Sequence, residues 1–132
     1  MTPTCLIAEA DLFIVRLLRR FAAETGMEAL QARTGQETID LARQARPDVI
    51  ILEPELPGKL RGWEVYQRLQ EDEQTAGIPV IACSWLPADE ARARLGEPGP
   101  VLCKPELYYE DFVLALQEAG VEAGPRAVQE ES

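Results

Sequence analysis

Four consecutive apolar residues, 49–52, constrain the fold more than any other stretch of this sequence. Their branched side chains suit a strand that is buried on both faces, as in a parallel sheet. The run stops at the carboxylate of Glu53, and two prolines and a glycine follow. Open α/β sheets place their binding sites at the carboxyl ends of central strands, so Glu53 is a candidate site residue. The alternative interpretation is an acid that only marks where the strand meets water.

Short apolar runs and amphipathic helical patterns alternate along the rest of the chain. Asp11 is placed to cap the helix that follows it, and Thr34 and Glu37 have the spacing of a capping box. We expect Trp63 and Leu69, with Tyr66 between them, on the inner face of the third helix. The predicted strands are 5–8, 27–32, 49–52, 77–83 and 101–103, and the predicted helices are 12–25, 34–45, 62–69, 87–95 and 106–119.

This order predicts a doubly wound α/β domain with three layers, in which helices cover both faces of a five-stranded parallel sheet. The expected domain spans 4–119, and the acidic tail 120–132 is expected to be disordered because it has little apolar content. Parallel strands end at the same edge of their sheet, so functional side chains should gather there. The polar residues at that edge are Glu9, Asp11, Glu53, Ser84 and Lys104.

Composition excludes several classes of function. The net charge of −10 argues against direct nucleic-acid binding, which needs clustered Lys and Arg. No apolar stretch is long enough to span a membrane, so we expect a cytoplasmic protein. The absence of histidine removes the commonest general base and metal ligand. The three cysteines, Cys5, Cys83 and Cys103, have no metal-type spacing and are predicted to be buried, reduced thiols.

Over about residues 4–119 the chain resembles the receiver domain of bacterial two-component response regulators. No one of the matching motifs is diagnostic, but their order and spacing together are specific. They are 47–52 leading to Glu53, Leu-Pro-Gly at 56–58, Gly-Trp-Glu-Val at 62–65, Ile-Pro-Val-Ile at 78–81 with Ser84, and Lys104-Pro105. The resemblance implies a flavodoxin-like fold with strand order 2-1-3-4-5.

In that family an aspartate after the third strand accepts a phosphoryl group from the phosphohistidine of a partner kinase. Two acidic residues after the first strand help to hold Mg²⁺, and a hydroxyl and a lysine contact the phosphoryl oxygens. A dense anion needs a cation, a positive side chain and hydroxyl donors close by.

The family's site residues carry over only in part. Lys104 and Ser84 match the lysine and the hydroxyl, and Glu9 falls on the first acidic position. Ala10 falls on the second acidic position and cannot bind a metal. Glu53 stands in place of the phosphoacceptor, with its carboxylate about 1.5 Å farther from the backbone. The resemblance thus implies a phosphoryl pocket of Glu53, Ser84 and Lys104 without its reactive aspartate.

Further departures concern the metal and the rim of the pocket. A degenerate Mg²⁺ site of Glu9, Asp11 and Glu55 is left open as a weak alternative to having no cofactor. Asp11 is the only aspartate near the end of the first strand, and helix capping is its alternative role. The pocket rim and partner surface are predicted at Trp85, Tyr108 and Tyr109.

The favoured interpretation is a stand-alone pseudo-receiver, a signalling module of a two-component or phosphorelay pathway rather than an enzyme. In this hypothesis Glu53 pairs with Lys104, phosphorylation is not needed, and the domain acts by binding a protein. The expected partner is a histidine kinase or a downstream regulator, and a homodimer is left open. One alternative is a functional phosphoacceptor with a degenerate Mg²⁺ site. A remoter alternative is a flavodoxin-like electron carrier, but this sequence lacks the phosphate-binding loop that such a carrier needs.

Overall fold

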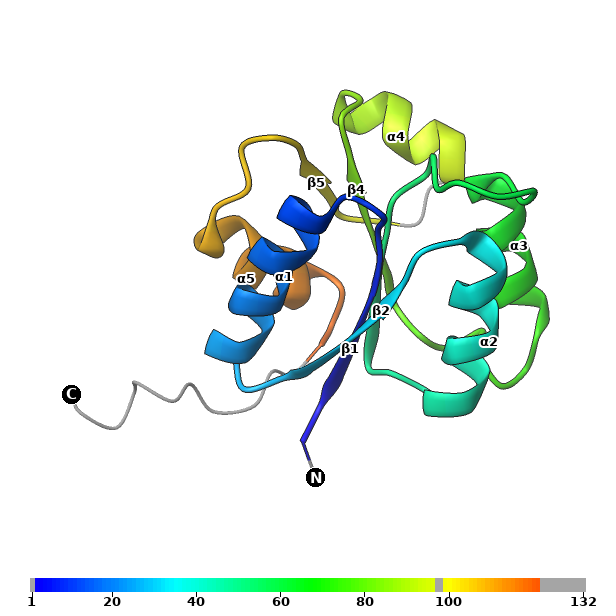
Figure 1. Cartoon of the computed structure of the whole chain (residues 1–132), viewed down its shortest axis with the longest axis horizontal. Coiled ribbons are helices and arrows are strands. Elements are labelled where there is room, and N and C mark those ends of the chain that lie inside the picture. The colour runs from blue at the N-terminus through cyan, green and yellow to red at the C-terminus, as the bar shows by residue number, and fades with distance from the viewer. Residues whose placement is uncertain (1, 97–98, 122–132) are drawn as a thin grey trace.

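Strand and helix alternate five times in the computed structural model, which describes residues 2–96 and 99–121 (Figure 1). The predicted element order is confirmed. The strands are β1 (Thr4–Ala8), β2 (Glu28–Ala32), β3 (Val49–Leu52), β4 (Val80–Ser84) and β5 (Val101–Cys103). The helices are α1 (Leu12–Glu24), α2 (Gly35–Ala45), α3 (Gly62–Glu71), α4 (Ala88–Leu95) and α5 (Tyr109–Glu118).

All five strands are parallel, and their order in the sheet is β2-β1-β3-β4-β5, as the resemblance implied. The order reverses between β1 and β3, where Cys5 pairs with Val49 and Ala8 pairs with Leu52. Helices α1 and α5 cover one face of the sheet, and α2 and α3 cover the other (Figure 1). The sheet is therefore the middle of three layers, with its carboxyl edge free for a site.

The core is divided by the sheet into two apolar clusters. Along β3 the side chains alternate between them, with Val49 and Ile51 facing α1 and α5, and Ile50 and Leu52 facing the opposite layer. All four are essentially inaccessible to solvent. Burying a side chain of this size contributes about 1.5–3 kcal/mol. The continuous apolar run of the sequence therefore exists because both faces of β3 are covered by helices.

The predicted cap of α1 forms in full, and that of α2 forms in part. The Asp11 carboxylate accepts hydrogen bonds from the backbone N–H groups of Phe13 (2.9 Å) and Ile14 (3.3 Å), which caps α1. The Thr34 hydroxyl accepts from the N–H of Glu37 at 3.1 Å. The Glu37 carboxylate, however, accepts from the N–H of Arg33 at 2.6 Å. Only the first half of the predicted capping box therefore forms at α2.

Four details of the sequence-based prediction are wrong. Strand β4 begins at Val80 and not at residue 77. Trp63 is 52% exposed because the buried stripe of α3 runs through Gly62, Val65 and Leu69, and Trp63 lies beside it. Cys103 is exposed because it ends β5, the edge strand of the sheet. Helix α5 begins at Tyr109 and not at residue 106, since Tyr108 keeps an extended backbone.

The predicted tail falls almost wholly outside the described residues, which end at 121, so its disorder stays a prediction. Within the described part of the chain, no helix combines the length and apolarity needed to cross a bilayer.

The three thiols should differ sharply in reactivity. Burial raises the pKa of Cys5 and of Cys83 to about 12, whereas Cys103 is exposed. Thiolate is the reactive form, so a disulfide reagent at neutral pH should rapidly modify one thiol in the native protein and all three after unfolding. The control is Cys103→Ser, which should abolish the fast phase. Rapid modification of that variant would contradict the burial of the other two.

Candidate functional site

Three strand ends bring the polar side chains of the site together. Backbone N–H groups continue the sheet ladder one residue past each strand. Glu9 donates to the carbonyl of Ala32 (3.0 Å), Glu53 to that of Ala8 (3.0 Å), and Lys104 to that of Ser84 (2.7 Å). The ladder therefore fixes the backbone of all three residues at the carboxyl edge.

Lys104 lies between two carboxylates at this edge. Its ammonium donates a hydrogen bond to Glu53 Oε1 at 2.6 Å and a second one to Glu9 Oε1. The exposed fractions of Glu9, Glu53 and Lys104 are 4%, 6% and 6%. The predicted pairing of Glu53 with Lys104 is confirmed. We call these three residues the buried acid–lysine cluster.

Backbone groups satisfy the remaining carboxylate oxygens of the cluster. Glu9 Oε2 accepts from the N–H groups of Ala10 and Asp11, both at 3.0 Å. Glu53 Oε2 accepts from the N–H of Glu55 at 2.7 Å. Two carboxylates and one ammonium leave an excess of one negative charge, and three backbone N–H dipoles point at it. Hydrogen bonds of this kind stabilise buried carboxylates.

The surroundings keep Lys104 protonated. Desolvation on burial alone would lower its pKa, but the hydrogen bonds and charges of Glu53 and Glu9 outweigh this effect, so its pKa is raised. The stabilisation that accompanies this shift is fully present below 10.5, the ordinary pKa of lysine. It is lost only as the pH rises through the higher value of the folded state. At neutral pH the protonated Lys104 is therefore shared by the two acids.

Ser84 and Trp85 form the rim beside Lys104. The Ser84 hydroxyl is buried and accepts a hydrogen bond from the N–H of Leu86 at 3.0 Å. The Trp85 ring centroid lies 5.5 Å from the Lys104 ammonium, within cation–π range, while 58% of the residue stays exposed. Trp85 thus lies where the sequence predicted a filled rim, and it shields one side of the ammonium.

The expected metal ligands are engaged elsewhere. Asp11 caps α1, and Glu55 forms an ion pair with Arg94 of α4 at 2.6 Å. Glu9 and Glu53 direct their oxygens to Lys104 and to backbone donors. Within 2–96 and 99–121, no three Cys, Asp or Glu side chains gather so that they could hold a metal. Protein-bound Mg²⁺ usually takes one or two carboxylate oxygens and completes its octahedron with water. Here the oxygens of Glu9 and Glu53 are engaged by Lys104 and backbone donors, so the residues do not fit the ion in this arrangement.

The two tyrosines predicted on the partner surface differ in exposure. Tyr108 is exposed, whereas Tyr109 is half-buried, with its ring 5.8 Å from the ring of Phe21 on α1. Of the two, Tyr108 therefore presents more of its side chain to a partner. A role for either residue in binding stays a prediction.

Sequence reasoning missed two contacts of the site. It assigned Glu9 only to a metal position, although Glu9 is also a direct partner of Lys104. In the expected strand order β1 lies next to β3, which places Glu9 beside Glu53. Because Glu53 was already expected to pair with Lys104, this adjacency could have revealed the contact between Glu9 and Lys104. It also missed the Glu55–Arg94 ion pair, which ties the loop after β3 to α4. Nothing in the local sequence pattern around Arg94 predicts that contact.

The fold and the cluster at its carboxyl edge define a receiver-type signalling domain. The chain belongs to the response regulator receiver domain family, which it matches over residues 5–99. It is 36% identical over 107 residues to the polar-differentiation response regulator DivK of Brucella ovis, a match that covers 80% of this chain and 86% of the relative. DivK of Brucella anthropi is 35% identical over the same length and with the same coverage.

Solved structures share the fold at lower identity. Chemotaxis response regulator CheY4 of Vibrio cholerae superposes with a TM-score of 0.78 and 22% identity, covering 90% of this chain and 99% of that one. The receiver domain of sensor histidine kinase PA1611 from Pseudomonas aeruginosa, solved with magnesium in its active site cleft, gives 0.77 and 19%, with coverages of 91% and 99%. These likenesses establish the fold alone.

Loss of Lys104 should expose how strongly the cluster depends on its cation. Lys104→Met leaves two buried carboxylates without a counter-charge and should lower the free energy of unfolding by about 3–5 kcal/mol. Urea unfolding at neutral pH measures this change. The triple variant Glu9→Gln/Glu53→Gln/Lys104→Met removes the acids as well and should recover much of the loss. Equal destabilisation of both variants would rule out charge compensation as the cause.

The loop after β3 depends on a close approach at Gly62. A Cβ there would lie 2.3 Å from the carbonyl oxygen of Pro54 and 2.9 Å from Leu95 Cδ2. Gly62→Ala should therefore cost about 1–3 kcal/mol of stability, as overpacking does. Gly77→Ala is the matched control, because nothing lies within 4 Å of its Cβ position. Thermal denaturation compares them, and equal melting temperatures would contradict the close approach.

Proposed function

We propose that this domain is a pseudo-receiver, which acts in a two-component pathway by binding a protein partner without being phosphorylated. The observation that carries the proposal is the hydrogen bond of 2.6 Å between the Lys104 ammonium and the Glu53 carboxylate. In receivers the lysine contacts the phosphoryl oxygens. Here the carboxylate of Glu53, a residue of the protein itself, binds that lysine directly.

Glutamate at position 53 supports the proposal through its length. Its carboxylate lies about 1.5 Å farther from the backbone than that of an aspartate. This extra reach carries the negative charge toward the place where a phosphoryl group would stand, and Lys104 meets it there. Glu53 therefore mimics part of the charge of a phosphorylated receiver and holds one arrangement of the site.

Two further features disfavour phosphoryl transfer. Both oxygens of Glu53 already accept hydrogen bonds, from Lys104 and from the N–H of Glu55, which lowers their nucleophilicity. Ala10 supplies no metal ligand at the second acidic position. A phosphoryl group that arrives without Mg²⁺ lacks the cation that neutralises its developing charge. The site keeps the geometry of a receiver without the parts that the reaction needs.

The remaining parts of the proposal follow from this role. The domain is a signalling module rather than an enzyme, its location is cytoplasmic, and its partner is a histidine kinase or a downstream regulator. Trp85, beside Lys104, and Tyr108 are both exposed and suit contact with such a partner. A homodimer would use the same kind of exposed aromatic surface.

The experiment that tests the proposal is phosphotransfer from acetyl phosphate, with and without Mg²⁺, followed by intact mass measurement. We expect no stoichiometric phosphorylation under either condition. Stoichiometric labelling at Glu53 or elsewhere would instead establish the alternative, a functional receiver with a degenerate metal site. A Mg²⁺ titration followed by Trp85 fluorescence in a Trp63→Phe background is the supporting measurement, and we expect no saturable quenching at millimolar metal.

Restoring the acceptor alone should not restore phosphorylation. Glu53→Asp shortens the side chain to the family's length, but Ala10 still leaves Mg²⁺ with too few ligands. We therefore expect labelling of this variant to stay at the wild-type level. The double variant Ala10→Asp/Glu53→Asp supplies both groups and should be labelled in a Mg²⁺-dependent manner. Robust Mg²⁺-dependent labelling of the single variant would refute this account of the site.

A further inference from the structure

A hollow of about 510 Å³ lies beside the loop that follows β3, and we call it the β3–α3 hollow. Its lining comes from that loop, from the first residues of α3 and from Arg94 near the end of α4. None of the lining residues belongs to the buried acid–lysine cluster. Small-molecule sites usually enclose about 300–1,000 Å³. The hollow is therefore large enough to hold a small organic molecule.

Basic side chains outnumber acidic ones in the lining of the β3–α3 hollow. Arg61 and Arg94 line it, and Glu55 is the only acid among the lining residues. Arg94 pairs with Glu55 at 2.6 Å, whereas Arg61 takes part in no ion pair within the described part of the chain. A guanidinium carries more N–H donors than one carboxylate oxygen uses, so Arg94 keeps donors for a ligand. The hollow therefore offers an uncompensated positive charge and two planar donor groups.

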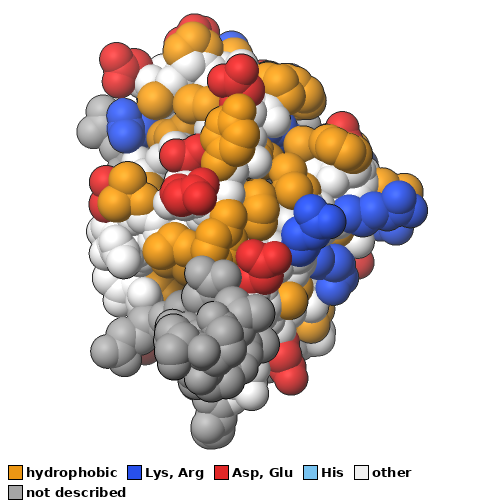
Figure 2. All heavy atoms as spheres, turned by 90° about the vertical axis from the view of Figure 1, so that its left-hand side faces the viewer, with side chains coloured by type: hydrophobic (Ala, Val, Ile, Leu, Met, Phe, Trp, Pro, Cys, Tyr) orange, Lys and Arg blue, Asp and Glu red, His pale blue; other side chains and the backbone are white. Residues whose placement is uncertain are grey.

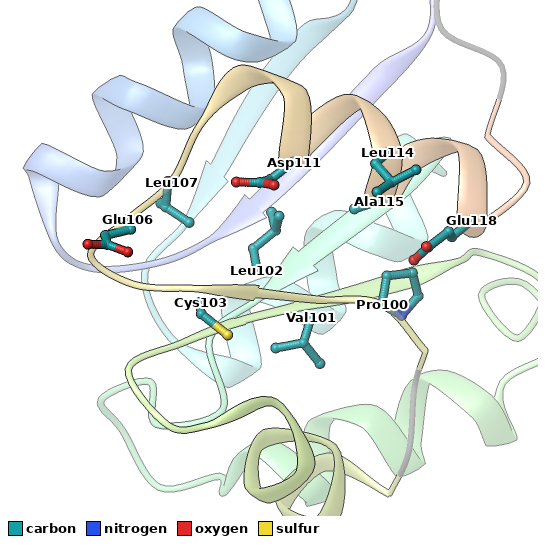
Figure 3. A pocket seen from close by; sticks show the side chains of 10 residues that line it. All are labelled: Pro100, Val101, Leu102, Cys103, Glu106, Leu107, Asp111, Leu114, Ala115 and Glu118. Atoms are coloured by element: carbon teal, nitrogen blue, oxygen red, sulfur yellow. The ribbon is translucent and has the colours of Figure 1, made fainter.

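Three other hollows of the described surface have a net negative lining. The one between β5 and α5 contains Glu106, Asp111 and Glu118 and no basic residue (Figure 3). The one between α2 and α3 has two arginines against three acids, and the one before β4 has Glu118 as its only charged residue. On the face that carries α1 and α5, acidic side chains lie among apolar ones and basic ones lie mainly at one margin (Figure 2). In a chain of net charge −10, the positive lining of the β3–α3 hollow is thus a local feature.

An exposed indole lies beside these charges. Trp63 lines the hollow together with Leu56, which is buried, and Leu60, which is half-buried. Packing of α3 does not account for the exposed ring, because the buried stripe of that helix is formed by Gly62, Val65 and Leu69. Planar rings stack on aromatic side chains of this kind. Trp63 therefore supplies a flat apolar surface next to the two guanidinium groups.

Glu55 adds a hydrogen-bond acceptor to the lining, and its position is fixed. Its backbone N–H donates to Glu53 Oε2 at 2.7 Å. Its carboxylate accepts from Arg94 through Oε2. Among the described residues no donor contacts Glu55 Oε1, so this oxygen remains open to an N–H group of a ligand.

We propose that the β3–α3 hollow binds a nucleoside monophosphate. The base stacks on Trp63, an amino group of the base donates to Glu55 Oε1, and the phosphate binds the guanidinium of Arg61. A phosphate monoester carries a charge of about −1.5 to −2 at neutral pH, and a guanidinium donates two parallel hydrogen bonds to it. The three kinds of group in the lining thus match the three parts of such a ligand. This inference goes beyond the proposed function and does not depend on it.

The test uses defined probes in isothermal titration calorimetry with the full chain at about 0.15 M salt. AMP and GMP are the complete ligands. Adenosine and guanosine supply the ring without the phosphate, and ribose 5-phosphate supplies the phosphate without the ring. We expect saturable binding of AMP or GMP with a Kd below about 0.1 mM, and at least about tenfold weaker binding of each partial ligand.

Two matched pairs of variants locate the binding site. Arg61→Gln removes the unpaired charge of the hollow, and Arg68→Gln removes another exposed arginine that takes part in no ion pair and lies outside the hollow. Trp63→Leu removes the ring, and Phe13→Leu removes an exposed ring on α1. The two hollow variants should weaken nucleotide binding by about tenfold and about fivefold, and the controls by less than about twofold. Thermal denaturation of each variant verifies that it remains folded.

Four outcomes would overturn the proposal. The first is no saturable binding of AMP or GMP up to about 5 mM. The second is an equal loss of affinity in Arg61→Gln and Arg68→Gln, because attraction would then depend on net charge alone. The third is binding of ribose 5-phosphate as tight as that of the nucleotides, which would leave no role for the ring. The fourth is tighter binding of indole-3-acetate, which would replace the phosphate with a carboxylate.

The outcome is separable from that of the proposed function. Phosphorylation of the wild-type protein by acetyl phosphate would overturn the pseudo-receiver proposal, whatever the nucleotides do. Loss of the nucleotide proposal leaves the phosphorylation result unchanged, since Arg61 and Trp63 share no hydrogen bond or ion pair with the buried acid–lysine cluster.

Discussion

The ammonium of Lys104, shared between the carboxylates of Glu9 and Glu53, is the interaction on which the carboxyl edge of the sheet depends. Each of the three groups is buried, and a buried charge without a partner costs several kcal/mol. The groups come from the ends of β1, β3 and β5, so the cluster joins strands at the centre and at one edge of the sheet. Backbone donors then stabilise the oxygens that the ammonium does not reach.

The cluster also orders the surface around it. Glu53 accepts from the N–H of Glu55, and the side chain of Glu55 pairs with Arg94 on α4. These contacts therefore connect Lys104 to α4 at the surface. Trp85 covers the other side of the ammonium. All of these contacts are made by groups of the protein itself. They are the basis for the proposal of a constant binding surface.

Much of this architecture could be predicted from the sequence, because it follows from local rules. The apolar run before Glu53, the cap at Asp11 and the alternation of strand and helix depend on neighbouring residues and on the handedness of crossovers. The failures have a different origin. Helical spacing left the direction of Trp63 ambiguous by one position, and an apolar neighbourhood did not show that Cys103 ends an edge strand. Both depend on what covers the residue in space.

The sequence by itself determined the fold class, the edge at which the site lies and the presence of an acid, Glu53, directly after β3, because periodicity and motif order carry that information. Only the tertiary structure decided how the charges are matched. It gave Lys104 a second acid in Glu9, 95 residues away in sequence, and it engaged Asp11 and Glu55 in contacts other than a metal site. Pairing between distant side chains depends on strand register and on side-chain reach, and neither is encoded in a local pattern.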